Sequence, residues 1–247
     1  MLEHAEALSA LAPAIVHGFT TRRGGFSQGR YATLNMGGKW GDDPEAVRRN
    51  QEAVAAAGGY AVEQLVRVKQ VHGAAVLRAS EVGPDREADA LWCHRDDGPC
   101  VVGVLTADCV PVLLADREGT AVAAVHSGWR GTVAGVSAAA VRALQGAGVS
   151  PARLVVAIGP CIEQPAFEVG EEVACQFDDA FVERERWPKP HVDLVGVVRS
   201  QLLGLGVPPG SIVRVGGCTH DQPERYFSFR RDGAGIGQMM SFIGLPG

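Results

Sequence analysis

The chain lacks any apolar run close to the roughly 20 residues that a membrane-spanning helix needs. Its first residues carry Glu3 and Glu6 instead of a basic start, which argues against a secretory signal peptide. It also lacks an excess of basic residues, since the formal net charge is -5 and the pI is about 5.8. An electrostatic surface for nucleic acid or anionic lipid is therefore not expected. We expect a cytoplasmic protein with neither a nucleic-acid nor a membrane partner.

No pair among the six cysteines has the C-x-x-C spacing, and no cysteine spacing repeats. This absence argues against a zinc ribbon and against an iron–sulfur cluster. In a reducing compartment we expect all six to stay as free thiols. What the chain does have is a composition typical of globular proteins, with 46% hydrophobic and 21% charged residues.

Strand and helix patterns are interleaved along the whole chain, without a linker long enough to separate domains. Helices are predicted from a cap at Asp43 to a stop at Gly58, from a cap at Thr132 to a stop at Gly146, and over 168–181 and 193–205. Strands are predicted over 15–20, 65–71, 88–92, 101–106, 110–115, 121–125, 154–158, 212–215 and 239–243. We therefore predict one α+β domain over residues 1–247, with mixed β-sheets packed by helices.

The alternative is a doubly wound α/β fold, which the succession of strands and helices permits. The three apolar runs between residues 101 and 125 have short connections, however, and short connections favour antiparallel pairing of consecutive strands. We expect the three runs to pair in this way.

Chemically active side chains gather at the ends of these central strands. Cys109 follows Asp108 where the first run ends, and His126 ends the third run. His72 lies beside a glycine at the end of another predicted strand. If the fold brings the three together, two imidazoles and one thiolate can hold a zinc ion with a fourth position open for water. A zinc-bound water ionises near pH 7, and Asp108 or Glu168 could then move protons.

The same residues permit other interpretations. Cys109 could be a nucleophile activated by His126, with Asp108 or Asp89 orienting the imidazole. A copper ion could occupy a site of two histidines and a cysteine, with an axial methionine supplied by one of three candidates, Met36, Met239 or Met240. Buried polar residues without a function are the fourth interpretation.

Two glycine-containing segments carry arginines that could hold an anion. Arg130 lies in the turn between the strand ending at His126 and the next helix, where free backbone N–H groups and the helix dipole favour negative charge. Arg23 precedes Gly24 and Gly25 in a polar loop. No Lys-Ser or Lys-Thr pair follows the last glycine of the first segment, so it is not a Walker motif.

The sequence resembles the YfiH-like family, whose members have long been labelled laccase-domain or multicopper polyphenol oxidase proteins. The resemblance runs through nearly the whole chain and rests on ordered motifs: Arg23-Gly24-Gly25-Phe26-Ser27, Leu34-Asn35, Gly41-Asp42-Asp43-Pro44, Gln70-Val71-His72-Gly73, Ala88-Asp89-Ala90-Leu91, Thr106-Ala107-Asp108-Cys109-Val110-Pro111, His126-Ser127-Gly128-Trp129-Arg130-Gly131-Thr132, Gly159-Pro160-Cys161-Ile162, Phe167-Glu168-Val169-Gly170 and Phe227-Ser228-Phe229-Arg230-Arg231.

This resemblance implies a metal site at His72, Cys109 and His126. It implies a zinc-dependent purine nucleoside phosphorylase that uses phosphate to cleave adenosine, inosine, guanosine and methylthioadenosine, and that deaminates adenosine. The alternatives are a copper-dependent polyphenol oxidase and a Cys/His hydrolase that edits a cell-wall precursor. We expect a nucleoside and phosphate as the ligands and a monomer as the oligomeric state. The candidate substrate- or phosphate-binding residues are Arg23, Asn35, Arg130, Glu168 and Arg230.

The chain departs from the family near its C-terminus. The family usually has a Gly-Arg pair before the last strand, whereas this chain has Gly237-Gln238. If the family arginine contacts the substrate, we expect weaker activity or a different substrate here, unless Arg230 or Arg231 compensates.

Overall fold

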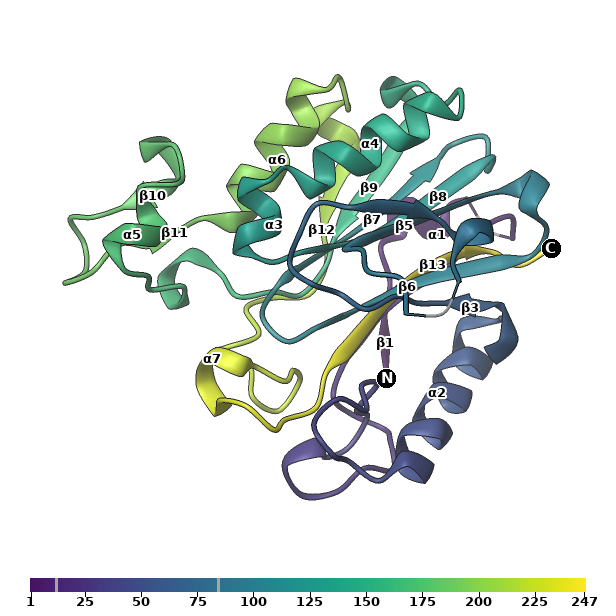
Figure 1. The fold of residues 1–247 in the computed structure, drawn as a ribbon, viewed down its shortest axis with the longest axis horizontal. Helices are drawn as coiled ribbons and strands as arrows, with labels where there is room; N and C mark the ends of the chain where they lie inside the picture. Colours follow the sequence, from purple (N-terminus) through teal and green to yellow (C-terminus); the bar gives the residue numbers. More distant parts are fainter. Residues whose placement is uncertain (12, 84) are drawn as a thin grey trace.

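Two β-sheets packed face to face form the centre of the molecule, and helices cover the outer face of each (Figure 1). The structure is a computed structural model that describes residues 1–11, 13–83 and 85–247. The five-stranded sheet has the order β1 (Leu2–Glu3), β2 (Val16–Thr20), β13 (Met239–Leu245), β6 (Cys100–Thr106), β3 (Leu65–Val66). The six-stranded sheet has the order β12 (Ile212–Arg214), β9 (Leu154–Ile158), β7 (Val110–Asp116), β8 (Ala121–Ser127), β5 (Ala90–His94), β4 (Val76–Arg78).

The helices are short except for three. The longest are α2 (Pro44–Gly58), α4 (Val136–Gly146) and α6 (Leu194–Gly204). The short ones are α1 (Glu6–Ser9), α3 (Trp129–Val133), α5 (Glu171–Ala174) and α7 (Phe229–Asp232). A small separate pair, β10 (Val182–Glu183) and β11 (His191–Val192), lies with α5 away from the two main sheets (Figure 1).

Strand β7 has an apolar sequence because both of its faces are buried. Successive side chains of a strand point to opposite sides. Val112 and Leu114 accordingly pack in the cluster that includes α4 and α6, while Leu113 and Ala115 pack in the cluster shared with the five-stranded sheet. With both faces covered, the strand needs no polar residue before its end.

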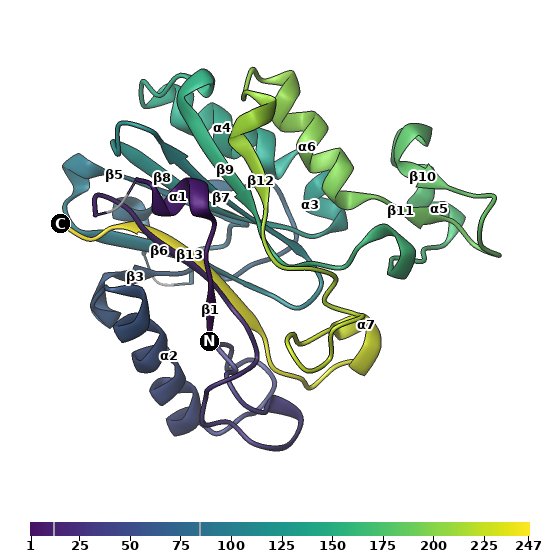
Figure 2. The same ribbon diagram turned by 180° about the vertical axis from the view of Figure 1, so that it is seen from behind.

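Each outer layer has its own helices. Helices α4 and α6 lie on the six-stranded sheet, and α2 lies on the opposite side of the molecule, against the five-stranded sheet (Figure 2). The ends of α2 follow local rules: the Asp43 side chain accepts the N–H of Glu45, Pro44 occupies the first turn, and Gly59 ends the helix in a left-handed conformation with φ 73°.

The α+β prediction with mixed sheets is confirmed, and the doubly wound alternative is wrong. Among the described residues, three strand pairings in the main sheets are parallel, β12 with β9, β4 with β5 and β3 with β6, and the others are antiparallel. Strands β7 and β8 pair antiparallel as predicted. The expected pairing of β6 with β7 is wrong, because β6 lies in the other sheet between β13 and β3. The short connection between β6 and β7 therefore crosses from one sheet to the other.

Two helix predictions also need correction. Thr132 does not cap a helix but lies inside α3, because Gly135, with φ 76°, separates α3 from α4. The predicted helix over 168–181 is reduced to α5, because Phe177 turns into the core beside α6 and Asp178 caps a separate 3-10 turn. The predicted helix at 193–205 is confirmed as α6, and the predicted closing strand as β13.

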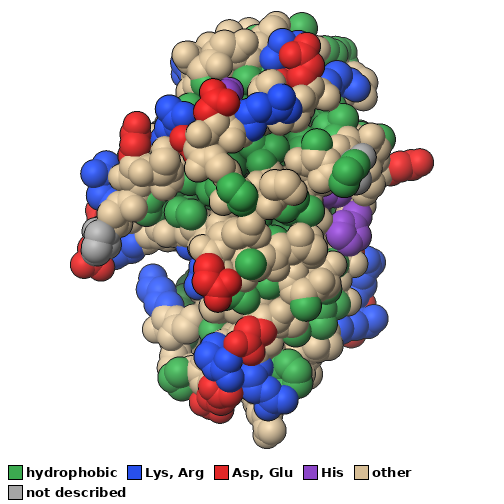
Figure 3. Space-filling model, turned by 90° about the vertical axis from the view of Figure 1, so that its right-hand side faces the viewer, with side chains coloured by type: hydrophobic (Ala, Val, Ile, Leu, Met, Phe, Trp, Pro, Cys, Tyr) green, Lys and Arg blue, Asp and Glu red, His purple; other side chains and the backbone are tan. Residues whose placement is uncertain are grey.

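The surface carries both signs of charge. On the face shown in Figure 3, Lys and Arg side chains lie among Asp and Glu side chains, with hydrophobic side chains between them. Within the part of the chain that the structure describes, no helix is both long and apolar enough to span a bilayer.

Candidate metal centre

The three predicted metal ligands meet where the two sheets are connected. Cys109 lies on the connection from β6 to β7, and His72 lies on the connection from β3 to β4; both connections pass from the five-stranded sheet to the six-stranded one. His126 is the next-to-last residue of β8. The ligand atoms of the three side chains all lie within 4.8 Å of one another. This group could hold a metal ion, as the sequence predicted.

The group is buried at one side and open at the other. His126 is buried, Cys109 is partly exposed and His72 is exposed. The rings of His72 and His126 meet edge to face, with centroids 4.8 Å apart. An ion held here would therefore be accessible from the His72 side, as a catalytic site with an open position requires.

The buried carboxylate of Asp89 holds both histidines. Its Oδ1 lies 2.8 Å from His126 Nδ1, and it accepts the backbone N–H of His72 at 2.9 Å. Its Oδ2 accepts the backbone N–H of Gly73 at 2.6 Å. Burial alone would raise the pKa of Asp89, but the hydrogen bonds from His126, Gly73 and His72 lower it below its usual range. An ionised Asp89 fixes the proton of His126 on Nδ1 and leaves Nε2 free for a metal ion.

Sequence reasoning did not place Asp89 among the site residues, although it named Asp89 as one of two residues that could orient His126. Asp89 lies immediately before β5, within the strand that the sequence predicts over 88–92. It is fully buried. A buried acid is rarely left without a partner, but only the fold reveals its burial.

Gly128 gives the three ligands room to approach. A Cβ atom at this position would lie 2.8 Å from His72 Cδ2 and 3.1 Å from Cys109 Sγ. The glycine is the N-cap of α3, and its backbone is not in the left-handed region. The requirement here is therefore space for the ligands and not conformational freedom.

Cys109 and His126 shift each other's pKa in opposite directions. Burial alone would raise the pKa of Cys109, but the charges and hydrogen bonds of His126 and His72 lower it to about 6. Burial alone would lower the pKa of His126, but the Cys109 charge and the Asp89 hydrogen bond raise it to about 9. Near neutral pH the thiol is thus a thiolate, the form that binds metals or attacks carbon.

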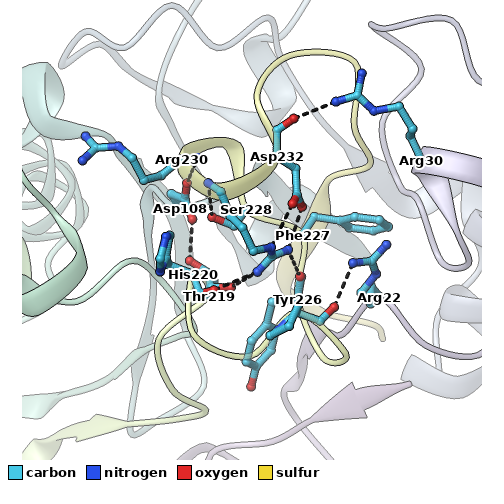
Figure 4. Close-up of polar contacts among 12 residues, drawn as sticks. Arg22, Arg30, Asp108, Thr219, His220, Tyr226, Phe227, Ser228, Arg230 and Asp232 are labelled. Atoms are coloured by element: carbon cyan, nitrogen blue, oxygen red, sulfur yellow. Dashed lines mark hydrogen bonds and ion pairs between the residues drawn. The ribbon is translucent and has the colours of Figure 1, made fainter.

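Asp108 is tied to the C-terminal part of the chain (Figure 4). Its Oδ1 accepts the Thr219 hydroxyl at 2.6 Å, and its Oδ2 accepts the backbone N–H of Arg230 at 2.6 Å. Its backbone has φ 88°, in the region that non-glycine residues rarely adopt. These bonds hold the sharp crossing between the sheets in place immediately before Cys109.

Two further predicted residues, Arg230 and Glu168, are linked to Asp108 by successive contacts. The Arg230 guanidinium donates to the backbone oxygen of Glu168 at 2.6 Å and lies over the ring of Phe167. The carboxylate of Glu168 pairs with Lys189 at 2.7 Å. The structure thus brings Asp108, Arg230 and Glu168 into one sequence of contacts.

The other three predicted binding residues make no contact with Asp108, Arg230 or Glu168 in the described hydrogen bonds. Arg23 is exposed and donates to the backbone oxygen of Glu224 at 2.7 Å. Asn35 is buried, and its amide bonds Gly37, Asp42 and the backbone N–H of Gln238. Arg130 is exposed, with its guanidinium 4.2 Å from the centroid of the Trp129 ring.

Gln238, the residue that departs from the family pattern, lies against the loop at Gly37. A Cβ on Gly37 would lie 2.3 Å from Gln238 Oε1. Arg231, considered above as a replacement for the family arginine, donates to the backbone oxygens of Thr219, His220 and Tyr226. Its guanidinium is therefore already engaged in holding the C-terminal loop.

A sequence profile described as multi-copper polyphenol oxidoreductase laccase matches residues 16–246. The chain belongs to this family. Within the family it is 40% identical over 236 residues to a protein of Deinococcus radiodurans named purine nucleoside phosphorylase, covering 94% of this chain and 90% of that protein. It is 37% identical over 234 residues to the Escherichia coli purine nucleoside phosphorylase YfiH, covering 92% of each chain.

Other family members carry other names or are known as structures. A protein named adenosine deaminase RL5, from an unknown prokaryotic organism, is 34% identical over 248 residues and covers 93% of each chain. The crystal structure of YlmD from Geobacillus stearothermophilus superposes with a TM-score of 0.86 at 30% identity, covering 98% of this chain and 94% of that one. A Neisseria meningitidis crystal structure superposes at 0.85 with 37% identity, covering 100% and 99%.

Replacing Asp89 by Asn should weaken metal binding. The amide keeps the size of the side chain but removes the negative charge that fixes the His126 tautomer, so we expect the affinity for zinc to fall about 10- to 100-fold. Competition with a chromophoric chelator measures this change. Asp96→Asn, at an exposed position, is the matched control, and equal affinities of the two variants would contradict the role of Asp89.

Replacing Gly128 by Ala should displace the side chains of His72 and Cys109 from their present positions. We expect a loss of metal affinity of about tenfold or more, because the added methyl group meets both ligands at less than normal contact distance. The control is Gly146→Ala in α4, where no atom lies within 4 Å of the added carbon. The same chelator competition applies, and wild-type affinity in Gly128→Ala would refute the space requirement.

Proposed function

We propose that this protein is a zinc-dependent purine nucleoside phosphorylase that also deaminates adenosine. The observation that carries the proposal is the convergence of His72, Cys109 and His126 in a chain whose relatives bear the names purine nucleoside phosphorylase and adenosine deaminase. The substrates proposed from the resemblance are adenosine, inosine, guanosine and methylthioadenosine, with phosphate as the second substrate.

The donor set supports zinc. Two imidazoles and a thiolate are usual zinc ligands, and the low pKa of Cys109 favours the thiolate that the metal needs. When bound, the ion would supply a Lewis acid and lower the pKa of a water molecule. His126 would bind through Nε2, held by Asp89, and His72 would complete the set from the exposed side.

The positions of the methionines and of the other histidines argue against copper. Met36 and Met240 pack in the core beside α2, and the sulfur of Met239 accepts the backbone N–H of Phe227. None of these contacts places an axial sulfur at the metal group. The remaining histidines have contacts elsewhere: His4 with His17, His94 with Asp96, His191 with Trp187 and His220 with Asp221. A centre of several copper ions would need more histidines together than this.

Phosphorolysis needs an anion-binding group close to the reacting sugar. A phosphate oxygen attacks C1′ of the ribose, and the bond from C1′ to the base nitrogen breaks, so the base leaves with the electron pair and takes up a proton. Arg130, two residues after Gly128, is exposed with its guanidinium over the Trp129 ring. The backbone N–H of Arg230 donates to Asp108, and its guanidinium donates to the backbone oxygen of Glu168. We assign these two arginines to phosphate, with Arg23 as a further binding residue and Asp108 or Glu168 as the group that moves the proton. Asn35, whose buried amide is fully hydrogen-bonded, is assigned to holding the loop at Gly37 and Gln238 in position.

An exposed aromatic pair offers a surface for the purine base. Phe229, 49% exposed, precedes Arg230 and lies 6.1 Å from the ring of Trp40. Trp40 in turn packs in the cluster with Ala107, two residues before Cys109. A flat base can stack on such rings while its sugar lies toward the metal group.

The same geometry supports a second candidate, a cysteine hydrolase acting on an amide of a cell-wall precursor. The sequence of contacts from Cys109 to His126 to Asp89 resembles a nucleophile, a base and an orienting carboxylate. Such an enzyme would work without a metal and would form an acyl group on Cys109.

Incubation with adenosine tests the proposed function. With phosphate, the zinc-loaded protein should release adenine and ribose 1-phosphate, and without phosphate it should release inosine and ammonia. Cys109→Ala and His126→Ala should each lose about 100-fold or more of both activities, because each removes one of three ligands. Chromatography of the products measures both.

His4→Ala, at an exposed position, is the control for the histidine variant. Chelation should abolish both activities, and zinc should restore them. Absence of adenine, inosine and hypoxanthine under every condition would exclude the proposed function. An amide hydrolysis that survives chelation, with an acyl group on Cys109 in the mass spectrum, would establish the second candidate.

Replacing Phe229 by Ala should weaken nucleoside binding. Stacking of a base on an aromatic ring contributes about 1–3 kcal/mol, so KM for adenosine should rise about tenfold while kcat changes little. Steady-state kinetics measures the two constants. Phe26→Ala, at another exposed phenylalanine that stacks with Arg49, should leave KM unchanged, and a fall in kcat alone for Phe229→Ala would rule out the stacking role.

A further inference from the structure

A polar cavity lies outside the candidate metal centre, at the edge of the five-stranded sheet beside β3. Its volume is about 280 Å³. Three of its lining residues are cations, Arg67, Lys69 and Arg86, and one, Asp85, is an anion. None of the three candidate metal ligands lines it. The cavity therefore has an excess of positive charge that the metal centre does not explain.

Arg67 is the unusual residue of this group. Its side chain is half-buried under the loop at Met36, where Nη1 donates to the backbone oxygen of Met36 at 3.1 Å. Within residues 1–11, 13–83 and 85–247, no carboxylate lies within ion-pair distance of its guanidinium. Burial accordingly lowers the pKa of Arg67, and the nearby Tyr60 opposes that effect only in part. A partly desolvated guanidinium with free N–H groups at a cavity wall is suited to an anionic ligand.

The walls of the cavity are held by the backbone of the sheet. The Gln70 side chain bonds both the N–H and the C=O of Leu105 at 2.8 Å, so β6 and the chain beyond β3 are held together. Lys69 donates its backbone N–H to the oxygen of Arg86 at 3.0 Å. These bonds fix the positions from which the three cationic side chains extend.

The two other cations lie nearer to solvent. Lys69 pairs with Glu87 at 2.7 Å, with both side chains largely exposed. An exposed pair of this kind is weak, so Lys69 can turn to another anion at little cost. Arg86 is exposed and belongs to no ion pair among the residues that the structure describes.

We propose that this cavity is a binding site for a phosphate-type oxyanion, in which Arg67 provides the buried contact and Lys69 and Arg86 the outer ones. A tetrahedral phosphate presents several acceptor oxygens to the planar donor fork of an arginine. The cavity is larger than a phosphate group, so either inorganic phosphate or the phosphate end of a phosphomonoester fits this chemistry.

Calorimetric titration of the zinc-loaded protein tests the site, with inorganic phosphate, adenosine monophosphate and adenosine as separate probes. Arg67→Gln should weaken the binding of both phosphate probes about 10- to 100-fold, because a charge-assisted contact is lost. Arg67→Lys should recover part of it. Arg142→Gln, at an exposed position of α4, is the matched control and should bind as the wild type does.

A substitution of Asp85 should change the phosphate affinity in the opposite direction, because it removes a negative charge. The φ of Asp85 is 58°, a conformation that asparagine also adopts, so Asp85→Asn removes a negative charge at the rim without straining the backbone. Phosphate should then bind about two- to fivefold more tightly, and the gain should fall as salt is added. If Arg67→Gln does not fold, Arg86→Gln and Asp85→Asn still give opposite shifts to compare.

The outcomes separate this cavity from the metal centre. Tighter binding of adenosine monophosphate than of phosphate, lost in Arg67→Gln, would identify a phosphomonoester as the ligand; equal binding of the two would identify free phosphate. Phosphate binding that survives Arg67→Gln but is lost in Cys109→Ala would place the anion at the metal centre and overturn the proposal. The proposal would also be overturned if Arg67→Gln weakened adenosine binding as much as it weakened phosphate binding. It would be overturned as well if the wild-type protein did not bind phosphate.

Discussion

The candidate site depends on one buried carboxylate. Asp89 accepts the ring N–H of His126 and the backbone N–H groups of His72 and Gly73, so a single charge fixes one histidine by its ring and the other by its main chain. A buried charge is tolerated only when its hydrogen bonds are satisfied. The cost of burying this carboxylate therefore keeps the β3–β4 connection against the end of β8. The positions of His72 and His126 therefore follow from the need to satisfy the buried Asp89 carboxylate with hydrogen bonds.

The second constraint is the packing of two sheets in contact. Chain segments that pass between the sheets must turn sharply, and two of the three candidate ligands lie on such segments. Asp108 shows how the turn before Cys109 is held, with a left-handed backbone and a side chain bonded to Thr219 and Arg230. Thr219 and Arg230 lie 111 and 122 positions after Asp108 in the chain, yet they are joined to it beside the site. Among the residues that the structure describes, the three candidate ligands lie on strands or connections and not on helices.

Local signals in the sequence were enough for much of the fold and for naming His72, Cys109 and His126 as candidate ligands, which the fold brings together. Some features act only on neighbouring residues, so the nearby sequence predicts the structure that they form. Examples are the helix cap at Asp43, the helix stop at Gly59 and the apolar strand that ends at His126. The partner of β6 did not follow, because a strand buried on both faces carries no alternation that distinguishes one sheet from the other. The role of Asp89 was hidden for a related reason: its burial is created by segments far away in the chain. Arg67 belongs to the same class, since only the fold places it under the loop at Met36.

The uneven burial of the three candidate ligands bears on how a metal ion would exchange with the surrounding solution. His126 is buried and Cys109 is partly exposed, whereas His72 is exposed on a connection between strands. An ion would enter and leave on the His72 side, so the exposed imidazole would lie on its path while His126 stayed shielded from solvent.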